Sequence, residues 1–109
     1  MTEVRLYVLQ RISAMVMAPL VMAHLALMIY AIQGGLSAAE ILSRTQGSFW
    51  WGGYYGLFVA AVSIHGALGL RVIIREELKW PDAVLNTFTF GAGLVLLTLG
   101  LRAVMAVVL

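Results

Sequence analysis

The residues of this chain whose chemistry stands out are its two histidines, His24 and His65. Each lies within a long apolar run, and the chain has no other histidine and no cysteine. Imidazole is a common metal ligand, but no carboxylate or thiol lies at the same depth, which disfavours zinc. The absence of cysteine excludes cysteine-bound iron–sulfur clusters. Haem iron held by neutral imidazoles is therefore the metal chemistry that these residues favour.

A second interpretation of the histidines is that they only hold helices together. A neutral histidine can donate a hydrogen bond between membrane helices, with a modest gain in stability. An ionisable group at membrane depth is costly, however, and marks a functional site by default. Two such residues, in a chain with only two histidines, favour the ligand role.

The neighbours of His65 suit a flat macrocycle. Gly69 is four residues further along and shares the same helix face, where it leaves room for a ring edge. Arg71 lies about 9 Å from His65 along the helix axis, where a guanidinium could meet a carboxylate. The alternative for Gly69 is helix packing, the interpretation that we prefer for the small residues elsewhere on this helix, Gly52, Gly56, Ser63 and Gly66.

Polar residues also mark the start of the first apolar run. Gln10-Arg11-Ile12-Ser13 places an amide, a cation and a hydroxyl together. Taken alone, this pattern is typical of an ordinary interfacial turn. Pro19 should kink the helix and free a carbonyl, and it either aims His24 or only shapes packing.

The elements that must position these residues are three membrane-spanning helices. Hydrophobic residues make up 62% of the 109 residues and charged residues 11%, whereas a soluble domain has about 25% charged residues. Ile12–Ile32, Phe49–Leu70 and Ala83–Leu101 carry no formal charge, and a span needs about 20 apolar residues. We predict one all-α membrane domain, residues 1–109, with helices at about 12–32, 49–75 and 83–107 and a short surface helix near Ser37–Ser43.

The basic residues predict the orientation of these helices. Five of them precede the first span or follow the second, and only two lie on the other side: Arg5, Arg11, Arg71, Arg75 and Lys79, against Arg44 and Arg102. The positive-inside rule then places the N-terminus in the cytoplasm and the C-terminus outside. The formal charge of +2 is too small and dispersed to suggest nucleic acid.

Two motifs together resemble a known family. His65-x3-Gly69-x-Arg71, followed by Glu76, resembles the second-helix motif of the cytochrome b membrane anchor of succinate dehydrogenase and fumarate reductase. Gln10-Arg11-Ile12-Ser13-Ala14 resembles the His-Arg-x-Ser-Gly motif that opens the first helix of that anchor. The resemblance covers essentially the whole chain.

The resemblance implies a haem b and quinone-interacting subunit in a bacterial-type inner membrane. It would pass electrons between flavoprotein and iron–sulfur subunits and ubiquinone or menaquinone, beside lipid and a second anchor chain, identical or homologous. His65 is then a haem ligand, with Gly69 and Arg71 near the haem. Arg11, Ser13 and Tyr7 border the quinone, and His24 resembles the first-helix ligand of two-haem anchors.

Departures from the family pattern occur at three places. Val72 replaces a second histidine that often follows the arginine, Tyr7 stands where a quinone-contacting serine is common, and Glu76-Glu77 replaces an aspartate-centred pair. Rival interpretations are a haem-free anchor and, less favoured, a small oligomeric transporter.

The arrangement of the two histidines also stays open. If Arg11 and Arg75 mark the cytoplasmic boundary, His24 lies about 20 Å deep and His65 about 15 Å deep. The two imidazoles then either share one haem or each pair with a histidine from a second chain. We favour two haems.

Overall fold

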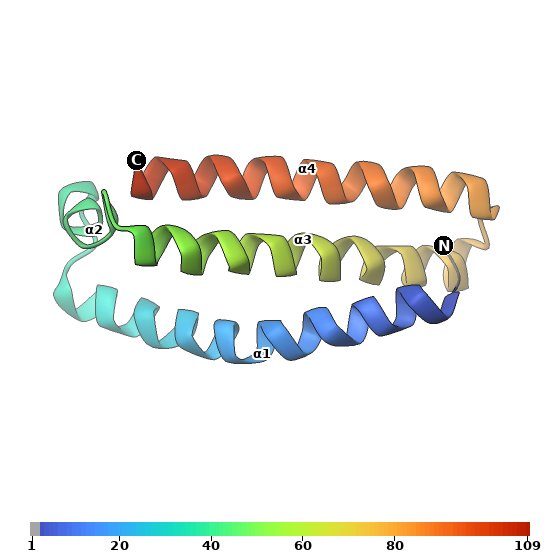
Figure 1. Ribbon diagram of the computed structural model, residues 1–109, viewed down its shortest axis with the longest axis horizontal. Coiled ribbons are helices and arrows are strands. Elements are labelled where there is room, and N and C mark those ends of the chain that lie inside the picture. The colour runs from blue at the N-terminus through green and yellow to red at the C-terminus, as the bar shows by residue number, and fades with distance from the viewer. Residues whose placement is uncertain (1–2) are drawn as a thin grey trace.

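The computed structural model describes residues 3–109, and its regular elements in this range are all helices (Figure 1). They are α1 (Glu3–Gly34), α2 (Ala38–Thr45), α3 (Phe49–Leu78) and α4 (Asp82–Val108). In Figure 1 α3 lies between α1 and α4, and it packs against both, while the short α2 contacts α4. The predicted helical membrane fold, with three helices long and apolar enough to span, is confirmed.

The helix ends follow local capping chemistry. Ser37 and Glu40 form a capping box at the start of α2, each side chain accepting from the other's backbone N–H. The left-handed conformation of Lys79, with φ of 53°, ends α3, and Pro81 precedes α4. α1 begins at Glu3, well before the apolar run that starts at Ile12. Its first turns therefore bring charged residues into the bundle.

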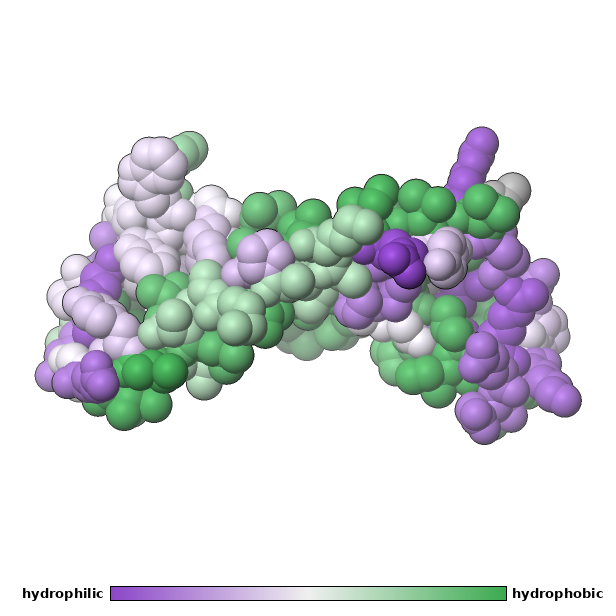
Figure 2. All heavy atoms as spheres, turned by 90° about the horizontal axis from the view of Figure 1, so that it is seen from below, coloured by the Kyte–Doolittle hydropathy of each residue, from purple (hydrophilic) through white to green (hydrophobic). Residues whose placement is uncertain are grey.

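Most of the surface of the chain is apolar. Figure 2, which views the bundle from the side of α1, shows a green apolar middle, with purple polar groups denser at the end that carries the N-terminus. Few apolar side chains are buried within the residues that the structure describes: Ala61, Ala67, Leu68 and Leu85. Lipid or other chains must cover the rest. The chain is thus a multi-pass membrane protein.

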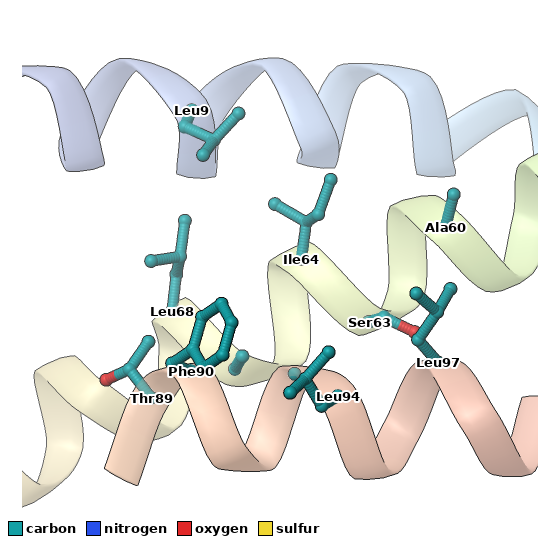
Figure 3. A pocket seen from close by; sticks show the side chains of 11 residues that line it. Leu9, Ala60, Ser63, Ile64, Leu68, Thr89, Phe90, Leu94 and Leu97 are labelled. Atoms are coloured by element: carbon teal, nitrogen blue, oxygen red, sulfur yellow. The ribbon is translucent and has the colours of Figure 1, made fainter. Parts of the chain in front are cut away.

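α3 and α4 approach each other through small residues. The side chain of Val59 occupies the space where a Cβ at Gly100 would lie, and Leu96 packs 3.3 Å from the Cβ position of Gly66. Nearer the N-terminal end, a cavity of about 350 Å³ is lined by residues of α1, α3 and α4 (Figure 3). Its lining, which includes Leu9, Phe90 and Leu94, contains no titratable group. This cavity can hold apolar atoms but offers no acid–base chemistry.

α1 is continuous through Pro19 and bows away from α3 near its middle (Figure 1). Proline lacks the N–H that would bond one turn back, which favours such a bend. Beside it, the Tyr54 hydroxyl donates a 2.7 Å hydrogen bond to the carbonyl of Leu20. This bond joins α3 to the backbone of α1 across the bowed stretch.

Candidate functional site

His65 lies on the face of α3 that meets α1, and its Nδ1 is 3.2 Å from the Ser13 hydroxyl oxygen. The Ser13 hydroxyl also lies 2.8 Å from the carbonyl of Gln10, to which it donates. Ser13 is 5% exposed and is the one buried residue of α1. The His65 ring is partly exposed, and its Nε2 makes no hydrogen bond to the residues from Glu3 to Leu109. One ring nitrogen is therefore engaged and the other is left for a ligand.

Gly69 faces the same part of α1 as His65. A Cβ at Gly69 would lie 3.5 Å from the side-chain nitrogen of Gln10, an ordinary van der Waals contact. Packing within the chain therefore does not require glycine here. The side-chain oxygen of Gln10 is buried without a hydrogen-bond partner among the described residues, so it can accept a bond from a bound molecule.

Arg71 joins three helices at the N-terminal end of the bundle. Its guanidinium lies 3.3 Å from the Glu3 carboxylate of α1 and 3.1 Å from the side-chain oxygen of Asn86 on α4. Arg75 pairs with the same carboxylate. Arg71 is 4% exposed, and a charge that deep requires such partners. The residue expected near a haem carboxylate thus already has an internal counter-charge.

A pocket of about 520 Å³ opens beside this ion-pair cluster, between the first turns of α1 and the end of α3. Tyr7, Gln10, Arg71 and Glu76 are among its lining residues. Hydrogen-bond donors, an unpaired acceptor and a carboxylate thus surround one space. Its volume and lining suit a small polar ring system.

Arg11 lies next to this pocket, not in its lining. Its guanidinium donates to the Tyr7 hydroxyl at 3.4 Å and lies 5.9 Å from the centre of the Tyr7 ring. Both side chains are exposed on α1. Such an exposed cation on a spanning helix needs a partner from outside the described chain or a route to the headgroups.

Ser13, which the sequence suggested as a quinone contact, is placed differently from Arg11 and Tyr7. Its single hydroxyl hydrogen is directed at the Gln10 carbonyl, and its oxygen faces His65. The hydroxyl is buried at the helix interface. It has no second hydrogen to donate to another molecule.

His24 lies toward the other end of the bundle, among aromatic side chains. Its ring centroid is 5.2 Å from that of Phe58 and 6.4 Å from that of Tyr55. Its Nδ1 is buried and has no hydrogen-bond partner within residues 3–109. Two cavities of about 200 and 290 Å³ share His24 and Tyr55 in their linings. The ring therefore faces α3, beside space that it does not fill.

The two histidines are further apart along the bundle than the sequence estimate of about 5 Å. His65 contacts Ser13, whereas His24 contacts Phe58. Along α3, Phe58 and His65 are seven residues apart, and along α1, Ser13 and His24 are eleven residues apart. At 1.5 Å per residue, the two contacts are therefore about 10 to 16 Å apart along the bundle. The two histidines could share one haem or each bind a separate haem. This separation along the bundle disfavours a single iron bound by both rings.

The estimate was wrong because Arg11 and Arg75 do not lie at one level. Arg75 pairs with Glu3, which precedes Arg11 by about two helical turns, or about 12 Å. When Arg11 is taken as the membrane boundary, the estimated depth of His24 is therefore too small compared with the depth of His65.

The donor set can be compared with what a haem needs. The described residues contain no group of three histidine, cysteine or acidic side chains able to hold a free metal ion. A haem brings its own equatorial nitrogens and needs only axial ligands from protein. A partly exposed His65 with an unused Nε2 fits the role of one such ligand.

Several residues of this region were not identified as site residues from the sequence. Glu3 and Asn86, which hold Arg71, lie in different helices, and no local pattern predicts their meeting. Gln10 was noted only as part of the Gln10–Ser13 motif. Its position within a family motif was the one signal that could have identified it.

These features describe an integral membrane subunit of three spanning helices whose polar contacts are concentrated between α1 and α3. The family model of the succinate dehydrogenase/fumarate reductase transmembrane subunit matches residues 2–101, nearly the whole chain. The chain belongs to this family. No curated protein and no solved structure matches it.

Proposed function

We propose that the chain is the haem b-binding, quinone-interacting anchor of a succinate dehydrogenase or fumarate reductase complex. It passes electrons between flavoprotein and iron–sulfur subunits and ubiquinone or menaquinone. Family membership supports the complex. The observation that supports the haem is the pairing of His65 Nδ1 with Ser13, because it leaves Nε2 without a partner from the described residues.

In this proposal His65 would hold the haem iron through Nε2. A bound haem supplies one-electron redox chemistry, which the protein tunes through ligation and surroundings. Gly69 leaves room for the ring edge. Arg71 has five N–H donors, and its bonds to Glu3 and Asn86 do not use them all. It can therefore still donate to a haem carboxylate. A second imidazole would come from a second anchor chain.

The quinone site that we propose is the pocket at the N-terminal end of the bundle. The Tyr7 hydroxyl in the pocket lining and the guanidinium of Arg11 beside the pocket donate hydrogen bonds to a quinone oxygen, and the unpaired Gln10 oxygen accepts one from the reduced hydroquinone. Reduction of a quinone to a hydroquinone takes two electrons and two protons. Two acids line this pocket, Glu3 and Glu76, and Glu3 is already paired with Arg71 and Arg75. We therefore assign proton transfer to Glu76. Ser13 borders this region, but we assign its hydroxyl a different role below.

The setting that we propose is a bacterial-type inner membrane with the N-terminus in the cytoplasm. The N-terminal end of the bundle carries Glu3, Arg71 and Arg75 and is the more polar end in Figure 2. Under the positive-inside rule this end faces the cytoplasm. The soluble subunits would dock there, next to the quinone pocket.

The experiment that tests the proposal is an absorbance spectrum of the purified membrane complex, with and without dithionite. We expect a reducible b-type band and at least one haem per anchor pair. His65→Ala should remove or strongly alter one haem signal in a complex that still contains all subunits.

An unchanged spectrum in an assembled His65→Ala complex would contradict the haem assignment. A wild-type complex that reduces quinone but has no haem band would instead identify a haem-free anchor. In that case His65 and Ser13 would only join α1 to α3.

A further inference from the structure

The position of Ser13 is unusual for its helix. α1 is apolar, and its other residues are at least partly exposed, yet the residue it buries is a serine. Burial of a hydroxyl is unfavourable unless it is hydrogen-bonded. Apolar packing therefore does not explain why Ser13 is buried. The explanation lies in its two hydrogen-bond contacts.

These two contacts determine which ring nitrogen of His65 carries the proton. Ser13 Oγ lies 2.8 Å from the Gln10 carbonyl oxygen and 3.2 Å from His65 Nδ1. A hydroxyl has one hydrogen. If Ser13 donated it to Nδ1, two oxygen acceptors would face each other at 2.8 Å without a hydrogen between them. Both contacts are satisfied only when Nδ1–H donates to Ser13 and Ser13 donates to Gln10.

The consequence concerns the other nitrogen of His65. With the proton on Nδ1, the lone pair of the neutral ring is on Nε2, and the ring is held in one orientation by α1. A hydrogen bond donated from the far nitrogen also makes a metal-bound imidazole a stronger donor, and its loss typically weakens metal affinity about 10- to 100-fold. A stronger donor favours the more positive, oxidised metal.

We propose that Ser13 is a positioning residue for the haem. It holds His65 as the Nδ1–H tautomer, aims Nε2 at the iron and lowers the reduction potential of the haem. This inference rests on the proposed ligation by His65. It connects the family-like motif on α1 to the ligand on α3, and it assigns Ser13 to the haem, not to the quinone.

The test compares Ser13→Ala with Ser63→Ala in the purified membrane complex. Ser63 is a matched control because it is also buried, lies two residues from His65 and donates only to the Val59 carbonyl of its own helix. The readouts are haem content, the midpoint potential from a dithionite titration and the electron paramagnetic resonance spectrum of the ferric haem. Dye reduction by the soluble subunits checks assembly.

We expect Ser13→Ala to raise the midpoint potential, change the ferric spectrum and lower haem retention about tenfold, while Ser63→Ala matches the wild type. Ser13→Thr keeps the hydroxyl and should stay close to the wild-type potential. If Ser13→Ala does not assemble, Ser13→Cys has a similar size and a weaker acceptor, and its potential should shift in the same direction.

Wild-type potential and spectrum in the assembled Ser13→Ala complex, or in Ser13→Cys if it must be used, would overturn the inference. That result would leave the proposed function intact, provided that His65→Ala still removes a haem. Conversely, no haem change in His65→Ala would overturn the ligation itself, whatever the outcome at Ser13.

Discussion

His65 and His24, toward opposite ends of the α1–α3 interface, have different surroundings. Near the N-terminal end, His65 has a defined hydrogen-bond partner in Ser13, and Arg71 and Glu3 join the same helices one or more turns away. Toward the α2 end, His24 lies beside the rings of Tyr55 and Phe58 on α3, with its Nδ1 unpaired among the described residues. A ring with a fixed tautomer is prepared to bind a metal, whereas a ring without a partner depends on a group from outside the chain.

Among the variants that test this comparison, His24→Ala should have the largest effect. We expect it to remove one haem and spare the haem at His65, because the contacts of the two rings are about 10 to 16 Å apart along the helices. The measurement is the haem-to-protein ratio of the purified complex, with separate midpoint potentials for each haem.

The other outcomes for His24→Ala are equally informative. Loss of all haem from an assembled complex would support a shared site and contradict the register described above. No loss would make His24 a packing residue. His65→Ala is the matched variant for the opposite end of the interface.

The sequence predicted the membrane fold because composition alone determines it. Runs of about 20 apolar residues with so few charges have no stable alternative to spanning helices. The shared face of His65 and Gly69 was also predictable, since it depends only on helical periodicity. The length of α1 was not, because the charged residues Glu3 and Arg5 interrupt the apolar pattern while the helix continues through them.

The contacts between helices could not be predicted in the same way. Ser13 and His65 are 52 residues apart, and Glu3 and Arg71 are 68 apart. Their meeting depends on the register of α1 against α3, which local propensity does not determine. The depth estimate failed for this reason: it assigned Arg11 and Arg75 to one level, while Glu3 is the residue that meets Arg75.

The next largest effect should come from Glu3→Gln at the N-terminal end. This change leaves Arg71, which is 4% exposed, without the Glu3 counter-charge. Because the Glu3 side chain itself is 52% exposed, the expected destabilisation is about 2 kcal/mol, between the values for exposed and buried pairs. Thermal dissociation of the purified complex should occur at a lower temperature.

Arg75→Gln is the control, because Arg75 is 45% exposed in its pair with Glu3 and an exposed pair contributes about 0 to 1 kcal/mol. Equal effects of the two variants would show that Arg71 does not depend on Glu3.

A smaller effect is expected for Arg11→Leu, which tests the same end of the bundle for function. Removing a charged hydrogen-bond donor from a quinone oxygen should slow quinone reduction about tenfold, equivalent to about 1.4 kcal/mol. Reduction of a soluble dye by the partner subunits should not change. Equal losses in the two assays would indicate an assembly defect and contradict a role at the quinone.

The smallest effect is predicted for Tyr54→Phe, which acts toward the α2 end. The Tyr54 hydroxyl donates to the Leu20 carbonyl at 2.7 Å, beside Pro19 and one helical turn before His24. Phenylalanine keeps the ring and loses this bond, so stability should fall by about 1 kcal/mol.

If the bond also helps to hold the bowed stretch of α1 that carries His24, a haem bound there should shift in potential while the haem at His65 does not. Thermal dissociation and a two-component redox titration measure both effects. A shift confined to the haem at His65 would contradict this division of the interface, because it would couple Tyr54 to the far histidine and not to the one beside it.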